Sequence, residues 1–215
     1  MTSKRKVGNP LALAVLACLF EKPMHPYEMA STMRERHKDQ SIKLNYGSLY
    51  TVMGALQRHR LIEPQETARE GNRPERTVYR ITDAGRLELI GWLSELLVEP
   101  AQEFTHFGAG LSLIPVLAPK DARDLLAQRC SRIQGLLEAA KAMQKFLAER
   151  NVPRLFWIDY EYRWRLLEAE LEWVRELIAE IDSGALEGLP MWLNWHELAG
   201  EAANVIPFGV KLGEQ

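Results

Sequence analysis

Apolar residues recur with a helical period through the first sixty residues and predict three helices. The first spans residues 10–20 and is apolar on nearly every side, so we expect it at the centre of its domain. The second spans residues 26–37, and the third spans residues 46–60 with Asn45 as its N-cap. Residues 38–45 are polar and predict a turn between the second and third helices.

Two short runs with alternating faces follow, at residues 62–67 and 77–81, and predict β-strands. The loop between them holds Gly and Pro turn residues and three arginines, Arg69, Arg73 and Arg76. Thr82 then caps a fourth helix that reaches about Val98. A helix-turn-helix followed by a hairpin with a basic tip is typical of a winged helix.

Beyond Pro100 the pattern is helical throughout. Residues 102–116 predict a mixed helix and loop segment, and a long helix is expected over residues 119–150. A second long helix is expected from Pro153 to about Asp182, where Ser183 and Gly184 stop it. Residues 185–215 predict a short helix rich in Leu and Trp, followed by an irregular tail.

The second long helix carries two apolar stripes. One keeps an unbroken alternation of three and four residues from Trp157 to Ile181, and predicts a coiled-coil seam. We expect its aliphatic part to form a homodimer interface through Leu167, Leu171, Val174 and Ile178. A second stripe lies beside it, at Leu155, Tyr162, Leu166, Ala169, Trp173 and Leu177. Two stripes require two partners, of which one is the preceding helix and the other is a second chain.

These elements predict a mostly α fold with two domains. Residues 1–98 form a winged helix-turn-helix with a small β-hairpin wing, and residues 99–184 form an antiparallel helical or coiled-coil domain for dimerisation and effector binding. Residues 185–215 are expected to pack on this second domain.

The net charge of −2 hides an asymmetry between these halves. Residues 1–97 carry 15 Lys and Arg against 11 Asp and Glu, whereas residues 98–215 carry 12 against 18. A basic half joined to an acidic half indicates that the first half meets a polyanion.

Other classes of protein find little support in the sequence. The thiols of Cys18 and Cys130 lie on apolar helical stretches and predict buried side chains in a reducing compartment. The five histidines have no metal-ligand spacing, and the common catalytic motifs are absent, so we expect no metal, no cofactor and no enzyme. The basic N-terminus before residues 11–20 imitates a signal peptide, but the apolar run is short and is needed as a core helix. We therefore expect a cytoplasmic protein without a membrane span.

The third predicted helix supplies the candidate nucleic-acid contacts. Leu49, Val52, Met53 and Leu56 must face the core, which turns a small, hydroxylic and basic face outwards. Gly54 lies on that outward face, where it costs about 1 kcal/mol against Ala and allows a partner to approach closely. The candidate contacts to double-stranded DNA are Tyr27, Lys43, Tyr46, Ser48, Tyr50, Thr51, Arg58, Arg69, Arg73 and Arg76. Each of these could also be an ordinary solvated residue, and Tyr27 and Lys43 could pack at a helix start.

Several motifs in order resemble the PadR family of bacterial regulators: His25-Pro26-Tyr27-Glu28-Met29, Tyr46-Gly47-Ser48-Leu49-Tyr50, Arg58-His59-Arg60-Leu61-Ile62-Glu63, Gly71-Asn72-Arg73-Pro74-Glu75-Arg76 and Tyr79-Arg80-Ile81-Thr82-Asp83-Ala84-Gly85-Arg86. The helical half is similar in layout to the larger PadR subfamily with an extended dimerisation domain. The resemblance implies a homodimer on an inverted repeat, repression of a nearby promoter and release by a small molecule. Both the effector and the sign of regulation vary within the family.

Five of the six tryptophans follow residue 150 and suggest a small aromatic or phenolic effector. The candidate lining is Trp157, Tyr160 and Trp164. The alternative is that these rings only fill the core, which is the usual place of large aromatics at helical spacing. A second function also stays open, in which the winged helix is a protein-interaction adaptor without specific DNA binding.

Overall fold

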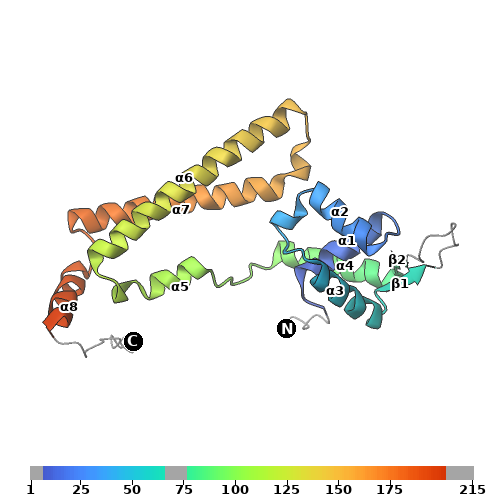
Figure 1. Cartoon of the computed structure of the whole chain (residues 1–215), viewed down its shortest axis with the longest axis horizontal. Helices are drawn as coiled ribbons and strands as arrows, with labels where there is room; N and C mark the ends of the chain where they lie inside the picture. Colours follow the sequence, from blue (N-terminus) through green and yellow to red (C-terminus); the bar gives the residue numbers. More distant parts are fainter. Residues whose placement is uncertain (1–6, 66–76, 202–215) are drawn as a thin grey trace. The chain divides into compact units, whose positions relative to one another are not determined.

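The computed structural model describes residues 7–65 and 77–201. The chain divides into two compact units, Met1–Glu103 and Phe104–Gln215, and each is treated by itself below. Figure 1 shows that helices dominate both units.

Unit 1 has the element order of a winged helix, which confirms the predicted fold class. Its elements are α1 (Pro10–Glu21), α2 (Pro26–Glu35), the 3₁₀ turn η1 (Lys38–Gln40), α3 (Tyr46–Arg58), β1 (Ile62–Gln65), β2 (Val78–Ile81) and α4 (Asp83–Val98). The helix starts follow from local chemistry. The side chains of Asn9, Asn45 and Thr82 accept hydrogen bonds from the backbone N–H groups of Leu11, Ser48 and Gly85.

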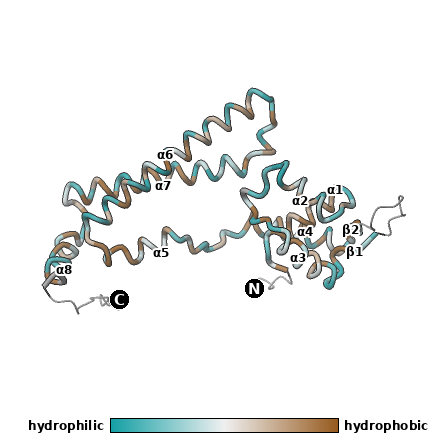
Figure 2. Tube along the Cα trace, viewed as in Figure 1, coloured by the Kyte–Doolittle hydropathy of each residue, from teal (hydrophilic) through white to brown (hydrophobic). Residues whose placement is uncertain are grey.

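Helix α1 lies at the centre of unit 1, as its apolar circumference predicts. The side chains of Leu11, Val15 and Leu16 have no exposed surface, and α1 packs against α2, α3, α4 and β2. Figure 2 shows hydrophobic and hydrophilic positions interspersed along the helices of both units. Strands β1 and β2 pair antiparallel with Ile62 opposite Ile81, and Met24 adds an isolated bridge to Tyr79.

Gly85 fixes the approach of α4 to the hairpin. A Cβ atom at this position would lie 2.1 Å from the backbone oxygen of Leu61, which no side chain can tolerate. The hydroxyl of Thr82 bonds the same loop, because its Oγ1 donates to the carbonyl of Arg60 at 2.8 Å. The start of α4 is therefore attached directly to the turn that follows α3.

Unit 2 is built on a long helical hairpin (Figure 1). Its elements are α5 (His106–Ser112), η2 (Ile114–Val116), α6 (Pro119–Glu149), η3 (Arg154–Phe156), α7 (Ile158–Ser183) and α8 (Leu189–Glu201). Leu171 and Val174 of α7 are buried with Leu126, Cys130 and Ile133 of α6. Gly184 and Gly188, with φ of 77° and 84°, flank the connection from α7 to α8.

Element ends differ from the predictions where the backbone turns early. Helix α2 ends at Glu35 because His37 takes a left-handed conformation, with φ of 54°. The second long helix begins at Ile158 rather than Pro153, because η3 occupies Arg154–Phe156. The two strands are also shorter than predicted, at four residues each.

The residues of the predicted dimer seam pack within a single chain, and their part in a dimer stays a prediction. Leu167, Leu171, Val174 and Ile178 belong to the core between α6 and α7 of the same chain, where Val174 has no exposed surface. The preceding helix therefore packs against the aliphatic stripe, and the N-terminal part of the second stripe remains exposed in the single chain. On that stripe Leu155, Tyr162 and Leu166 are 71%, 65% and 52% exposed.

Several other properties bear on function. None of the helices in residues 7–65 and 77–201 is long and apolar enough to cross a membrane. Within the same residues, no group of three or more His, Cys, Asp or Glu side chains could hold a metal ion. Burial raises the pKa of the Cys18 thiol to about 11, so this thiol stays protonated and unreactive at neutral pH.

We expect Val174→Asp to destabilise unit 2 by roughly 3–5 kcal/mol, because it places an unpaired charge in the α6–α7 core. Urea unfolding followed by circular dichroism measures the change. Arg175→Asp, at the exposed neighbouring position, is the control and should change the unfolding free energy by about 0.5 kcal/mol or less. Equal unfolding midpoints for the two variants would contradict the observed helix pairing.

Candidate functional site

Helix α3 presents one face to the core and the opposite face to solvent. Leu49, Val52, Met53 and Leu56 are at most 5% exposed, which confirms the predicted inner face. The outer face carries Tyr50, Thr51, Gly54 and Arg58, all exposed. Tyr50 shows 57% of its surface to solvent although it is a large aromatic residue. This face offers a phenolic hydroxyl and a guanidinium group to an external partner.

The start of α3 is tied to α2 by an exposed aromatic cluster. The rings of Tyr27 and Tyr46 stack with their centroids 6.4 Å apart and their planes at 12°. Arg34 donates to the hydroxyl of Tyr46 at 2.9 Å and lies 4.9 Å above the centre of its ring. The two tyrosines are 63% and 40% exposed, so this contact joins α2 and α3 at the surface.

Backbone N–H groups at the helix starts are partly occupied by caps. The Asn45 side chain accepts from the N–H of Ser48 at 2.7 Å, and His25 Nδ1 accepts from the N–H of Tyr27 at 3.1 Å. Ser48 is half-buried beside its cap, whereas Lys43 is exposed in the preceding turn. Lys43 and the exposed tyrosines are therefore better placed than Ser48 to meet a phosphate.

Gly54 has no packing role among the residues that the structure describes. A Cβ atom at this position would have no heavy atom within 4 Å, in contrast to Gly85. A glycine in a helix interior costs about 1 kcal/mol against Ala. The residue therefore lowers the stability of the free protein while keeping the centre of the outer face flat.

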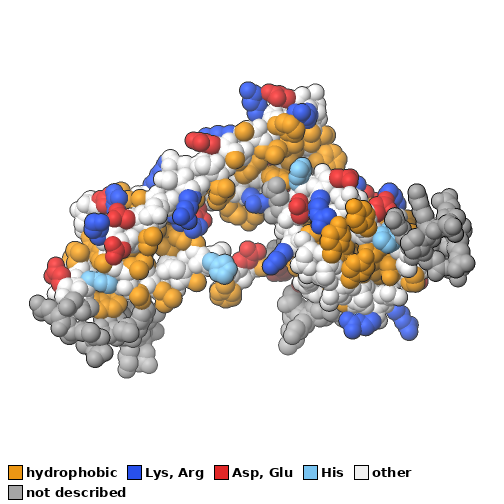
Figure 3. Space-filling view, in the orientation of Figure 1, with side chains coloured by type: hydrophobic (Ala, Val, Ile, Leu, Met, Phe, Trp, Pro, Cys, Tyr) orange, Lys and Arg blue, Asp and Glu red, His pale blue; other side chains and the backbone are white. Residues whose placement is uncertain are grey.

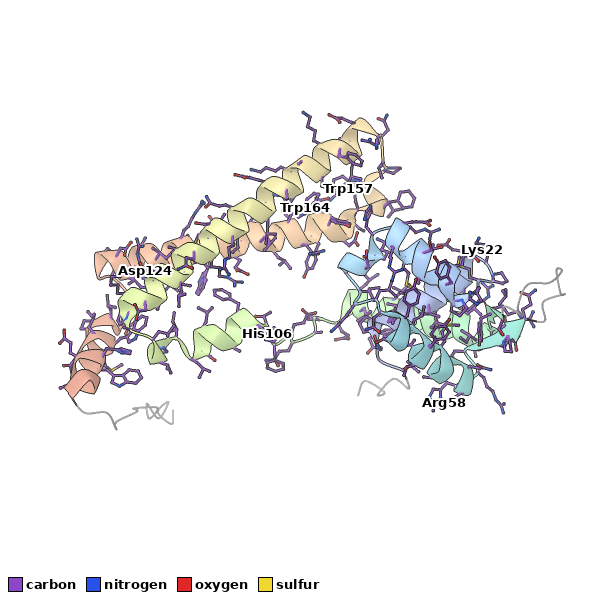
Figure 4. All side chains as sticks on the ribbon, in the orientation of Figure 1. Lys22, Arg58, His106, Asp124, Trp157 and Trp164 are labelled. Atoms are coloured by element: carbon purple, nitrogen blue, oxygen red, sulfur yellow. The ribbon has the colours of Figure 1, made fainter. Side chains whose placement is uncertain are left out.

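Some basic side chains of unit 1 form ion pairs with carboxylates, and others form none with a described residue. Lys22 pairs with Glu28, Arg36 with Glu21, and Arg80 with Glu63. The hydrogen bond from Arg36 lowers the pKa of Glu21. Lys43 and Arg58 form no ion pair within the described part of the chain. Figure 4 labels Arg58 at the outer end of α3, and Figure 3 shows Lys and Arg side chains at that edge of unit 1.

Three of the predicted contacts lie outside the described residues. Arg69, Arg73 and Arg76 belong to the loop between β1 and β2, of which only the strands are described. The paired strands place the two ends of this loop next to each other, with Gln65 opposite Val78.

The predicted effector residues form a cluster at one end of α7. The ring centroids of Trp157 and Tyr160 lie 6.0 Å and 6.1 Å from that of Trp164. Trp157 Nε1 donates to the backbone oxygen of Val152 at 3.3 Å, which ties this ring to the loop after α6 (Figure 4). The three rings are half-buried against one another. This packing favours the structural alternative for the cluster.

Two apolar grooves occur elsewhere in unit 2. One, of about 1110 Å³, lies among α5, η2, α7 and α8 and is lined by Trp173, Trp192 and Trp195. The other, of about 510 Å³, lies between α5 and α6 and is lined by Phe107, Arg129 and Arg132. Figure 3 shows hydrophobic side chains gathered on this unit. The five tryptophans after residue 150 indicate a site in unit 2, but only the packing of α8 shows which of them line the same groove.

Comparisons with known proteins agree with this architecture. Residues 15–90 match the transcriptional regulator PadR-like family. No curated protein matches the sequence.

Solved structures with the same fold include Bacillus subtilis PadR in complex with operator DNA, with a TM-score of 0.63 and 20% identity over 80% of this chain and 99% of that one. B. subtilis PadR in complex with p-coumaric acid has a TM-score of 0.61 at 18% identity, over 80% and 95% of the two chains. The Vibrio cholerae virulence activator AphA has a TM-score of 0.58 at 19% identity, over 80% and 98%.

The matched residues begin within α1 and end within α4, so they contain the whole of α2, α3 and the paired strands. The winged helix of residues 15–90 is therefore a member of the transcriptional regulator PadR-like family.

Proposed function

We propose that this protein is a cytoplasmic transcriptional regulator that binds duplex DNA through the outer face of α3 and the arginine-bearing loop between β1 and β2. The observation that carries the proposal is the combination on α3 of exposed Tyr50 and Arg58 with Gly54, which has no packing role among the described residues. A helix of this kind fits the major groove, and a flat centre allows it to approach the duplex closely.

The candidate contacts to phosphates differ in chemistry from the candidate contacts to bases. Lys43, Arg34 and the stacked tyrosines carry donors suited to phosphate oxygens, which position a protein on DNA without reading its sequence. Tyr50 and Thr51 lie along the face that would meet base edges, whereas Arg58, at the end of α3, would meet a phosphate. The structure of B. subtilis PadR with operator DNA supports a DNA target for this fold.

We further propose that the protein is a homodimer on an inverted repeat. The support is the uncovered stripe of α7, where Leu155, Tyr162 and Leu166 remain exposed after the aliphatic stripe has paired with α6. A two-fold dimer places two copies of α3 on half-sites with centres about 34 Å apart, or a multiple of that distance.

We propose that the protein represses transcription, and that binding of a small aromatic molecule relieves the repression. The complex of B. subtilis PadR with p-coumaric acid supports an aromatic effector, and the apolar grooves of unit 2 offer room for one. A ligand shifts DNA affinity only by its differential affinity for two shapes of the dimer.

An adaptor function without specific DNA binding is the second candidate. It is favoured by the exposed apolar side chains of α4, where Leu87, Ile90 and Leu97 are 74%, 55% and 85% exposed. A mobility shift and footprint on the region upstream of the protein's own gene separate the two. A symmetric footprint supports regulation, and no binding at low salt supports the adaptor.

We expect Arg58→Ala to weaken DNA binding on all sequences if the guanidinium meets a phosphate. The slope of log affinity against log salt should then flatten by about one unit. Mobility shifts over a series of salt concentrations measure the slope. Arg175→Ala on α7 is the control, and an equal effect from both arginines would remove α3 from the interface.

Gly54→Ala should raise the free energy of unfolding by about 1 kcal/mol and weaken DNA binding roughly tenfold, because the added methyl group lies where the duplex approaches. Urea unfolding and mobility shifts measure the two effects. Gly91→Ala is the matched control, since a Cβ atom in the middle of α4 also meets nothing within 4 Å. This variant should raise the free energy of unfolding without changing the affinity for DNA. Tighter DNA binding by the Gly54→Ala protein would exclude close approach at this position.

Leu166→Asp should dissociate the dimer without unfolding the hairpin, because the side chain is exposed in the single chain. Sedimentation velocity reports the oligomeric state, and circular dichroism reports the fold. Arg175→Asp, on another face of α7, is expected to remain a dimer. A Leu166→Asp protein that is still dimeric would assign the interface to another surface.

A further inference from the structure

The groove among α5, η2, α7 and α8 has a rigid wall. Helix α8 is anchored by Trp192, whose Nε1 donates to the backbone oxygen of Leu117 at 2.8 Å, and by His196, whose Nε2 lies 2.9 Å from the oxygen of Pro115. Leu189 and Trp192 are buried in a small core with Ala122 of α6. The α8 wall is therefore held in place by contacts with the segment that precedes α6 and with α6 itself.

Aromatic and soft apolar side chains form most of the lining. Trp173, Trp192 and Trp195 come from two helices, and Met191 between them is 66% exposed. Trp173 is 45% exposed and meets Phe107 edge to face, at 6.4 Å and 79°. This contact holds the indole in place, while the exposed part of Trp173 is available to a ligand.

The charge of the lining has a single sign. Among the described residues, Glu187 is the one charged side chain that lines this groove, and no lysine or arginine does. Its carboxylate forms no ion pair with another described residue, and it is exposed to solvent. The hydroxyl of Ser112, which also lines the groove, is already bonded to the carbonyl of Ala109 at 2.8 Å. The faces of indole rings also attract cations, so the tryptophans and the carboxylate of Glu187 both favour a positively charged ligand.

The second groove of unit 2 has the opposite character. Arg129 and Arg132 line it, and Arg129 lies 3.7 Å above the centre of the Phe107 ring. Arg129 also pairs with Glu170, which leaves Arg132 as a cation for a ligand. An anionic ligand would therefore find better partners between α5 and α6 than in the groove beside α8.

We propose that the groove among α5, η2, α7 and α8 binds a lipophilic organic cation, held by the faces of Trp173 and Trp195 and by the carboxylate of Glu187. The proposal rests on the proposed function only where it makes this ligand the effector that changes DNA affinity. Binding itself depends on unit 2 alone. A volume of about 1110 Å³ accommodates a molecule of several aromatic rings.

The test uses two ions of the same size and shape but opposite charge, tetraphenylphosphonium and tetraphenylborate. Isothermal titration calorimetry of the full-length protein measures both affinities. The phosphonium ion is expected to bind about tenfold more tightly than the borate ion. Equal affinities, a preference for borate, or no binding of either ion would overturn the proposal. The last result is expected if another protein segment fills the groove.

Three variants locate the site. Trp173→Leu keeps apolar bulk but removes the indole face, and should weaken phosphonium binding roughly tenfold while changing borate binding less. Glu187→Gln should weaken phosphonium binding about two- to fivefold, with Glu197→Gln on α8 as the control that has no effect. Trp164→Leu tests the aromatic cluster near the α6–α7 loop. A loss of binding with Trp164→Leu but not with Trp173→Leu would move the site and refute the assignment.

DNA binding is measured separately in the absence of either ion. If the protein does not bind DNA but still prefers phosphonium to borate, the proposed function is rejected and the assignment of the groove as a cation site is supported. Intact DNA binding without a preference for phosphonium rejects the groove alone. Phosphonium binding that leaves DNA affinity unchanged supports the site and rejects this cation class as the effector.

Discussion

The contact between the aliphatic stripe of α7 and α6 determines what the rest of unit 2 exposes. Leu171 and Val174 can be buried only once, and Leu126, Cys130 and Ile133 of the same chain bury them. The stripe with Tyr162, Leu166 and Trp173 is then left without a partner in the hairpin. Because exposed apolar surface is unfavourable in water, a second chain or a ligand would gain the most binding free energy by covering this face.

An equivalent constraint orders unit 1. Helix α1 is buried on nearly all sides, so each neighbouring element must give it an apolar face. For α3 this requirement turns Tyr50, Gly54 and Arg58 outwards together. The candidate DNA face is thus a consequence of core packing as well as a choice of surface residues.

The sequence predicted unit 1 well because its signals are local. Asn45 and Thr82 cap the helices that they were expected to cap, and the core positions of α3 have an unambiguous period. The two stripes of α7 could not be assigned in the same way, since either satisfies the packing rules for a long helix. The choice depends on packing against α6, through pairs of residues well separated in sequence, such as Arg129 and Glu170.

The candidate effector site was harder to predict for a related reason. Trp157, Tyr160 and Trp164 lie close in sequence and do meet, but they meet one another. The tryptophans that line the large groove come from α7 and α8, which are joined through a turn whose direction no periodicity reveals. Hydrogen bonds between distant segments, such as that from Trp192 to Leu117, fix this arrangement.

The turn between α7 and α8 has two glycines in the left-handed region, Gly184 and Gly188. Residues other than glycine adopt this region only with strain, so a side chain at either position would change the direction in which α8 leaves the hairpin. Glu187 lies between the two glycines and lines the groove, so this turn places both the α8 wall and the carboxylate. A substitution at either glycine would therefore move a wall of the groove and its charge together, and the size and the charge of the molecule admitted would change as one property.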